Sequence, residues 1–288
     1  MQRFLILFIT LATTFIQPAF AQALYHEEEQ AEAEDPGLPL KILHAEPLYI
    51  DLIRDLGARK GEREWNVGGA LVDREKFDSY ELLVEYEWAV RDRWGLELEV
   101  PVTLYSWNKR NGDRPLEGRL PSNRIESLKM ATQYTFLVSE KAQASLAIGG
   151  IVEWEFADLD GMTLRRAFDG VLINPFFIAA KRLGPHWHSL LYTGPRLRRH
   201  FYHSGQDFAY EINTNFHYMI PGSRNFIGVE VNKIIESDIF SVVLRPQMRL
   251  EINETLMLGI VPGIPLNARD ERLSAFVRLI YEPGHPPK

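Results

Sequence analysis

A strict alternation of side-chain character in residues 92–107, "DRWGLELEVPVTLYSW", restricts the fold of this chain more than any other feature. Every second residue from Trp94 to Leu104 is large and apolar, whereas the positions between them include Glu97 and Glu99. A period of two residues is typical of a β-strand with two different faces. A strand of about ten residues, tilted, is long enough to cross a lipid bilayer. The stretch therefore predicts a strand with its apolar face toward lipid and its glutamates inside a barrel.

The same period recurs from Glu64 to Tyr281. We expect about twelve strands, many of them longer than the usual five or six residues. They are 64–72, 81–90, 94–105, 125–138, 143–156, 171–182, 186–198, 208–220, 226–234, 240–252, 255–264 and 273–281. Tight connections alternate with longer polar ones, among them 73–80 and 235–238, and aromatic residues gather near the strand ends, as in outer-membrane barrels. The predicted fold class is all-β, a transmembrane antiparallel meander β-barrel. Strands 171–182 and 255–264 are apolar on both faces, so their facing stays open.

The first forty residues predict export and a linker. Residues 1–21 carry Arg3, an apolar core and the small-residue pattern Ala19-Phe20-Ala21, which together indicate a secretory signal peptide. Residues 22–40 contain the acidic run "HEEEQAEAED" followed by prolines, which favours a disordered linker. The chain has no cysteine, so it is stabilised without disulfides.

Residues 41–61 separate this linker from the barrel, which we expect over 62–288. The stretch "EPLYIDLIRDLG" places Pro47 at a first helical position and Gly57 at a C-terminal stop. Leu48, Leu52, Ile53 and Leu56 would then form one apolar stripe. The pattern predicts a short helix within a periplasmic or plug segment.

The hairpin "YEWAVRDRWGLELEVPVTLY", residues 86–105, resembles a signature of an outer-membrane barrel family named for the MetA pathway of phenol degradation. The resemblance implies a barrel that carries small, often hydrophobic compounds across the outer membrane. It covers one hairpin and the general length and architecture. The stretch "HAEPLYIDLIRDLGARKGE", residues 44–62, also resembles a family-specific N-terminal signature, to which no activity is attached.

Thirteen charged residues fall on the faces that we expect to point into the lumen. The acidic candidates are Glu85, Glu87, Glu97, Glu99, Glu153, Glu155, Glu211 and Glu251, and the basic ones are Arg196, Arg198, Arg245, Arg249 and Arg278. Interleaved acids and bases in a narrow barrel usually pair and fill space. A lining that selects solutes is the alternative, because rings of charge decide what passes a pore. Glu64 and Arg278 lie on the two strands that close the barrel, where an ion pair between them is plausible.

The resulting functional hypothesis is a channel or transporter for small solutes, including hydrophobic or aromatic compounds, and not an enzyme. One alternative is a barrel hydrolase that uses "HFYHSGQD", residues 200–207, which brings His200, His203, Ser204 and Asp207 together, although adjacent His203 and Ser204 tend to point apart on an extended chain. The other is a closed barrel with a structural or partner-binding role. The expected partners are the outer-membrane bilayer, small solutes and, during biogenesis, the barrel-assembly machinery. The net charge of −7 and the lack of a basic stripe argue against nucleic acid. No cofactor or metal is expected, since the two histidines of "HWH", residues 186–188, lack a third ligand in the sequence.

Overall fold

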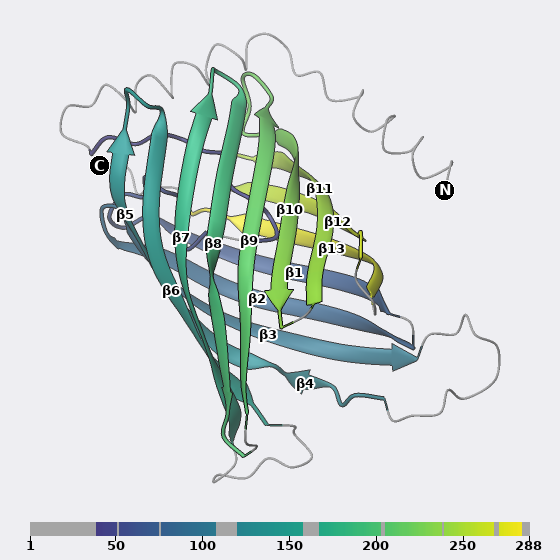
Figure 1. Cartoon of the computed structure of the whole chain (residues 1–288). Coiled ribbons are helices and arrows are strands. Elements are labelled where there is room, and N and C mark those ends of the chain that lie inside the picture. The colour runs from purple at the N-terminus through teal and green to yellow at the C-terminus, as the bar shows by residue number, and fades with distance from the viewer. Residues whose placement is uncertain are drawn as a thin grey trace, which may run out of the picture.

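A computed structural model describes residues 39–50, 52–74, 76–107, 120–157, 167–202, 205–237, 239–267 and 271–283. Within these ranges the chain forms one closed antiparallel β-barrel (Figure 1). The strands are β1 Arg63–Arg74, β2 Phe77–Arg91, β3 Trp94–Trp107, β4 Arg124–Ile125, β5 Ser127–Ser139, β6 Ala144–Phe156, β7 Phe168–Leu183, β8 Trp187–His200, β9 Gln206–Met219, β10 Phe226–Glu236, β11 Ile239–Asn253, β12 Leu256–Pro265 and β13 Glu271–Tyr281. The signal peptide and nearly all of the acidic linker lie outside the described residues.

The strands follow a meander, in which each long strand pairs with its neighbours in sequence. β4 has only two residues and lies against β3, as β5 does, so the described part of the chain contains twelve barrel strands. β1 pairs with β13 over Trp65–Arg74 and closes the barrel. Both the predicted fold class and the expected strand number are confirmed. In these ranges no helix is long and apolar enough to cross a bilayer.

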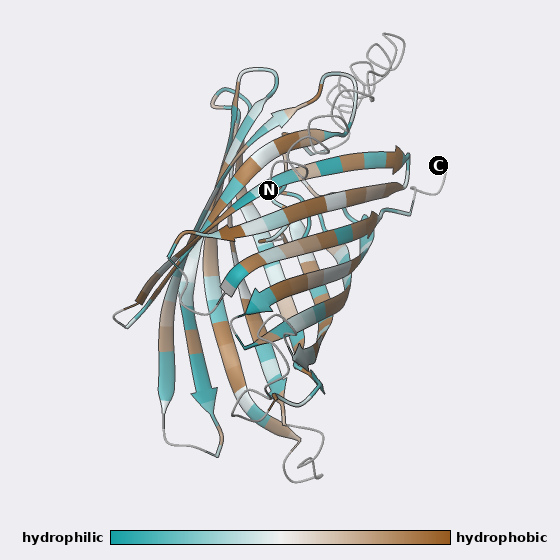
Figure 2. Ribbon diagram, turned by 90° about the vertical axis from the view of Figure 1, so that its right-hand side faces the viewer, coloured by the Kyte–Doolittle hydropathy of each residue, from teal (hydrophilic) through white to brown (hydrophobic). Residues whose placement is uncertain are grey.

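The facing predicted for the opening stretch is also confirmed. Leu98 and Val100 of β3 are 39% and 37% exposed on the outside of the barrel, whereas Glu97 and Glu99 between them are 2% and 7% exposed. Bands of hydrophilic and hydrophobic residues alternate along the strands in the same way (Figure 2). Hydrocarbon can solvate the outer face but not ionised carboxylates, so the burial pattern fits a barrel in lipid.

Connections at the two ends of the barrel differ less than the sequence predicts. The tight turns after β2, β5, β7, β9 and β11 are all present. At the other end, however, the expected loop 73–80 shrinks to residues 75–76, because β1 and β2 remain paired as far as Asp73 and Asp78. The expected loop 235–238 likewise reduces to residues 237–238. Long connections follow β3 and β6.

Candidate functional site: a lumen closed by a plug loop

The N-terminal part of the described chain lies inside the barrel (Figure 1). Residues 41–58, which we call the plug loop, start and end beside the tight turn between β2 and β3. There the backbone amide of Arg93 donates to Ala58 O at 2.6 Å, and the Arg93 guanidinium donates to Leu40 O at 3.1 Å. Lys41 Nζ lies 2.7 Å from Asp55 Oδ2 and joins the two arms of the loop. The plug loop therefore enters the lumen from the short-turn end and returns to it.

The tip of the plug loop reaches the middle of the lumen. The ring of Tyr49 packs edge-on against Phe276 of β13, with 5.9 Å between the ring centroids. The Arg245 guanidinium of β11 lies 3.3 Å from the centroid of the Tyr49 ring. These contacts fix the tip against the wall formed by β11 to β13.

Two apolar areas of the lumen wall receive the plug loop. Leu48 packs with one cluster from β10, β12 and β13, which contains Phe226, Met257, Val261, Phe276 and Ile280. Leu52, Ile53 and Leu56 pack with the other, from β5 to β8, which contains Ala131, Ala147, Phe176, Ile178, Ala180, Leu190 and Tyr192. The inward residues of β7 and β12 thus belong to these clusters. Those strands are apolar on both faces because lipid covers one face and the plug loop covers the other.

The prediction of a short helix over residues 47–57 is wrong, because the described residues of this stretch form bends and turns only. Side chains of the barrel wall accept hydrogen bonds from backbone amides in and beside this stretch, including those of Ile50 and Ile53, which a helix beginning at Pro47 would bond internally. Ala45 N donates to His188 Nδ1 at 2.7 Å, Leu48 N to Gln247 Oε1 at 2.8 Å, Ile50 N to Glu230 Oε1 at 3.1 Å and Ile53 N to Gln133 Oε1 at 3.3 Å. An irregular loop also lets Leu48 and Leu52 reach different walls, whereas a helical stripe would serve one.

Arg54 is the main charge that the plug loop brings into the lumen. It is 6% exposed, and its guanidinium lies 2.7 Å from Glu64, 3.7 Å from Glu62 and 3.8 Å from Glu87. Burial by itself would lower the pKa of Arg54, but the neighbouring carboxylates hold it well above its ordinary value. Its φ of 94° is in the left-handed region, which costs a non-glycine residue free energy. Packing and ion pairs therefore hold Arg54 in this conformation.

The ion pair suggested between Glu64 and Arg278 is wrong. The β1–β13 register places Arg278 opposite Gly68, four residues from Glu64. Glu64 pairs with Arg54 instead, and Arg278 Nη2 lies 3.7 Å from Glu85 Oε2.

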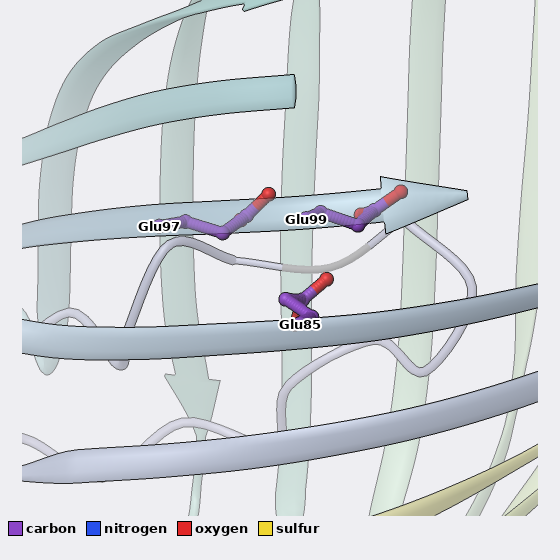
Figure 3. Close-up of side chains that lie close together, drawn as sticks. All are labelled: Glu85, Glu97 and Glu99. Atoms are coloured by element: carbon purple, nitrogen blue, oxygen red, sulfur yellow. The ribbon is translucent and has the colours of Figure 1, made fainter. Parts of the chain in front are cut away.

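Three buried glutamates meet on the inner face of β2 and β3 (Figure 3). One carboxylate oxygen from each of Glu85, Glu97 and Glu99 lies within 4.8 Å of the others. The strand register explains this, since Glu85 is directly opposite Glu99. Lys129 Nζ of β5 lies 2.6 Å from Glu99 and 3.0 Å from Glu97. The oxygens are of the kind that Ca²⁺ or Mg²⁺ prefers, but the Lys129 ammonium already serves them as a cation.

Above the plug loop, toward the long-loop end, the lumen contains a cavity of about 690 Å³. Tyr49, Ile50 and Ile53 of the plug loop form part of its lining. Apolar wall residues such as Ile151, Leu172 and Phe276 continue it, and charged residues of β3 and β5 to β9 surround them. The volume lies in the range of small-molecule binding sites.

The structure separates the thirteen predicted lumen residues into three groups. Glu99, Glu153, Glu155, Arg196, Arg198, Glu211 and Arg278 line the cavity, and Glu85, Glu87, Glu97 and Arg245 are buried at or below its level. Arg249 and Glu251 lie near the short-turn end. There Arg249 Nε donates to Arg224 O at 3.0 Å, and Glu251 Oε2 accepts from Arg224 N at 3.2 Å.

Several residues that hold the plug loop were absent from the sequence prediction. They include Gln133, His188, Glu230 and Gln247 on the wall and His44 and Arg54 in the loop. For the wall residues a signal exists, because each is a polar position on an alternating strand. For the loop residues no pattern of the sequence shows that they enter the barrel.

His44 and Glu46 of the plug loop ionise far from their ordinary pH ranges. His44 Nε2 lies 3.0 Å from Ser145 Oγ, and burial lowers the pKa of His44 to about 4, with Arg182 adding to the effect and Asp55 opposing it. Burial raises the pKa of Glu46 to about 8, with the charges of Asp55 and Glu64 adding to the effect. Both groups are therefore neutral near pH 6 while the loop is docked. Burial would raise the pKa of Asp55, but Lys41 and Arg54 lower it.

The predicted hydrolase motif is only partly described. His200 Nε2 lies 2.9 Å from Asp207 Oδ2 at the long-loop end. His203 and Ser204, the proposed base and nucleophile, lie outside the described residues.

Comparison with known proteins identifies the family to which this chain belongs. The model of the HAEPLYID-like family matches residues 40–282, which span the plug loop and the whole barrel. The chain belongs to the HAEPLYID-like family. The family name is a string of one-letter residue codes, HAEPLYID, and this string occurs in the sequence as residues 44–51, in the first half of the plug loop. No curated protein matches the chain.

Among solved structures, the HAEPLYID-like chain is similar to an outer-membrane channel of Pseudomonas putida F1 designated COG4313. The TM-score is 0.59 at 13% sequence identity, and the match covers 79% of this chain and 98% of the channel. The NanC porin gives a TM-score of 0.52 at 10% identity and covers 76% of this chain and 99% of the porin. At such identities the likeness concerns the fold alone. The matching family model is not that of the phenol-degradation barrels, whose likeness is confined to the 86–105 hairpin.

Proposed function

We propose that this protein is an outer-membrane channel for small solutes, in which the plug loop must leave the lumen wall before a solute passes. The observation that carries the proposal is the cavity that opens from the long-loop end and ends on the plug loop. Solutes with an apolar or aromatic part suit its lining. The distant likeness of one hairpin to barrels of phenol degradation is in line with such solutes.

The way in which the loop is held supports movement rather than a permanent closure. Its amides bond to wall side chains such as Gln133 and Gln247, and those hydrogen bonds are replaced by water when the loop leaves. The described strands pair with one another and not with the plug loop, so the barrel keeps its ladder of backbone hydrogen bonds in either state. The loop can thus be released without unfolding the barrel.

A reversible disulfide tests this proposal. A Cβ atom at Gly259 of β12 would lie 3.4 Å from Leu48 Cγ, so a cysteine pair at the two positions is close to the geometry of a disulfide. The chain has no cysteine that could interfere. We expect the Leu48→Cys/Gly259→Cys variant to conduct ions in a planar bilayer when reduced and to stop conducting when oxidised.

The two single-cysteine variants serve as controls and should conduct equally under both conditions. Full conductance of the oxidised double variant would show that the loop does not have to move. Absence of conductance in the wild type, the reduced variant and a variant that lacks residues 41–58 would refute the channel itself.

A hydrolase remains the alternative, favoured by the His200–Asp207 pair at the loop that contains Ser204. We expect Ser204→Ala to leave conductance unchanged and to remove no esterase activity. Loss of an esterase activity in this variant alone would assign the loop an enzymatic role.

A further inference from the structure

The basic and the acidic side chains that line the cavity differ in how they are paired. The lysine and arginine side chains of its lining are Arg74, Arg124, Lys129, Arg196, Arg198 and Arg278. Five of them lie beside a carboxylate: Arg124 at 2.6 Å from Glu126, Lys129 at 2.6 Å from Glu99, Arg196 at 2.9 Å from Glu211, Arg198 at 2.8 Å from Glu155 and Arg278 at 3.7 Å from Glu85. The sixth, Arg74, lies over the Phe77 ring at 6.0 Å.

Among the residues that the structure describes, Glu153 of β6 has no such counter-charge. Its Oε1 accepts a hydrogen bond from Ser127 Oγ at 2.7 Å, and no basic side chain of the described residues forms an ion pair with it. In the register, Glu153 is directly opposite Lys129 of β5, which would be its natural partner. The Lys129 ammonium, however, turns to Glu97 and Glu99. The Glu153 carboxylate therefore faces the cavity, and among the described residues the neutral hydroxyl of Ser127 is its only hydrogen-bond donor.

An apolar surface lies beside this carboxylate. Ile151 is two residues from Glu153 on the same face of β6, and Leu172 is directly opposite Glu153 on β7. Ile50 and Ile53 of the plug loop complete this part of the lining. A ligand with a cationic head and an apolar body would complement both features, because it supplies the missing charge and covers apolar surface.

We infer that the cavity binds organic cations, namely amines with an apolar or aromatic body, with the ammonium group at Glu153. This inference rests on the proposed function, whose solute class it specifies. An anion of the same shape would meet five basic groups that carboxylates already engage, and it would face Glu153 with a charge of the same sign. A neutral analogue would keep the apolar contacts and lose the ion pair.

Three compounds with the same body and different head groups test the inference. 2-Phenylethylammonium, 2-phenylethanol and phenylacetate should be titrated calorimetrically into the full chain in detergent at neutral pH. We expect the ammonium to bind about tenfold more tightly than the alcohol, because a hydrogen bond to a charged group typically contributes a free energy of this size. Phenylacetate should bind most weakly. The Glu153→Gln variant should bind the ammonium about as weakly as the alcohol, again a loss of about tenfold.

Glu140→Gln is the matched control, because Glu140 lies in the exposed turn between β5 and β6 and its removal changes the net charge equally. It should leave all three affinities unchanged, and gel mobility before and after boiling confirms that each variant is folded. Equal affinity for the three compounds, or an equal effect of both variants, would overturn the inference. Calorimetry needs no ion flow, so a barrel that binds the ammonium but does not conduct would refute the channel and leave the binding site standing.

Discussion

β3 and β7 present the same kind of surface to lipid but opposite kinds of surface to the lumen. On β3 the inward residues include Glu97 and Glu99, whereas on β7 they include Phe176 and Ile178. The difference follows from what each strand faces inside. β3 meets Lys129 and the polar side of the plug loop, and β7 meets Leu52, Ile53 and Leu56. An apolar inward face in a barrel can therefore indicate a segment of the chain inside it.

The largest expected effect comes from removing the charge that the plug loop brings to the polar wall. Arg54→Ala removes the buried guanidinium from Glu62, Glu64 and Glu87, of which Glu62 keeps Lys41 at 3.5 Å. Breaking a buried ion pair from one side typically costs about 3–5 kcal/mol. We expect a loss of this size in the free energy of docking the loop, measured as faster maleimide labelling of a single cysteine introduced at Leu48. Leu48 is 2% exposed in the docked state. Unchanged labelling would mean that the polar wall does not hold the loop.

The second effect concerns the outer face that both strands share. Leu98→Arg places a charge near the middle of the bilayer and should cost about 2–4 kcal/mol of barrel stability. Leu104→Arg, on the same face of β3 near its end, should cost about 0–1 kcal/mol, since the penalty falls toward the interface. Urea unfolding in lipid vesicles measures both. If the two variants are equally stable, the assigned depth of β3 in the membrane is wrong.

The pH dependence of docking separates two residues of the plug loop. Glu46 is protonated in the docked loop up to about pH 8. A released Glu46 would ionise near its ordinary pKa of about 4.5, so docking weakens by up to about tenfold per pH unit as pH rises toward 8. His44 acts in the opposite direction. In the docked loop the pKa of His44 is about 4, so His44 stays neutral until the pH falls to that value. Release allows protonation below about pH 6.5, so docking weakens as pH falls through that window.

We expect the two contributions to oppose each other between about pH 4.5 and 6.5 and Glu46 to dominate above this range. Glu46→Gln should remove the weakening between pH 6.5 and 8 and reveal the weakening in acid that His44 causes, whereas His44→Asn should let docking strengthen as pH falls from 6.5 to 4.5. The labelling rate of the cysteine at Leu48 measures docking, and a cysteine at the exposed Glu140 corrects for ionisation of the thiol. A Glu46→Gln profile identical to that of the wild type would contradict the assignment.

The smallest effect compares the two faces of β7 directly. Ile178 is fully buried against the plug-loop cluster, whereas Ile173 is 45% exposed on the outside. Ile178→Val should cost about 0.5–1.5 kcal/mol, as is usual for a packed core. Ile173→Val should cost less, because lipid chains adapt to the lost methylene group. Faster labelling of the cysteine at Leu48 in Ile178→Val only would tie the cost to docking. Equal costs at the two positions would mean that the inner face of β7 is not a packed core.

Local pattern in the sequence was sufficient to predict the barrel. Each strand shows its two faces through a period of two residues, and this signal depends only on the solvent that each face meets. The strand number, the meander order and the inward facing of residues such as Glu97 and Arg245 follow from it. Strands 171–182 and 255–264 are apolar on both faces, which is a sign that something covers their inner face. The sequence did not identify the plug loop as that cover, because a periodic pattern does not say what lies against a face.

Only the tertiary structure decided what fills the lumen. Residues 47–57 have the caps and the stripe of a helix, yet Glu230 and Gln133 on distant strands accept hydrogen bonds from the amides of Ile50 and Ile53. Likewise, Lys129 turns to Glu97 and Glu99 rather than to Glu153 opposite it, and Glu64 pairs with Arg54 rather than with Arg278. Helix propensity and strand alternation are properties of neighbours along the chain. Partners inside a closed barrel are chosen among residues far apart in sequence, and burial makes each choice energetically large.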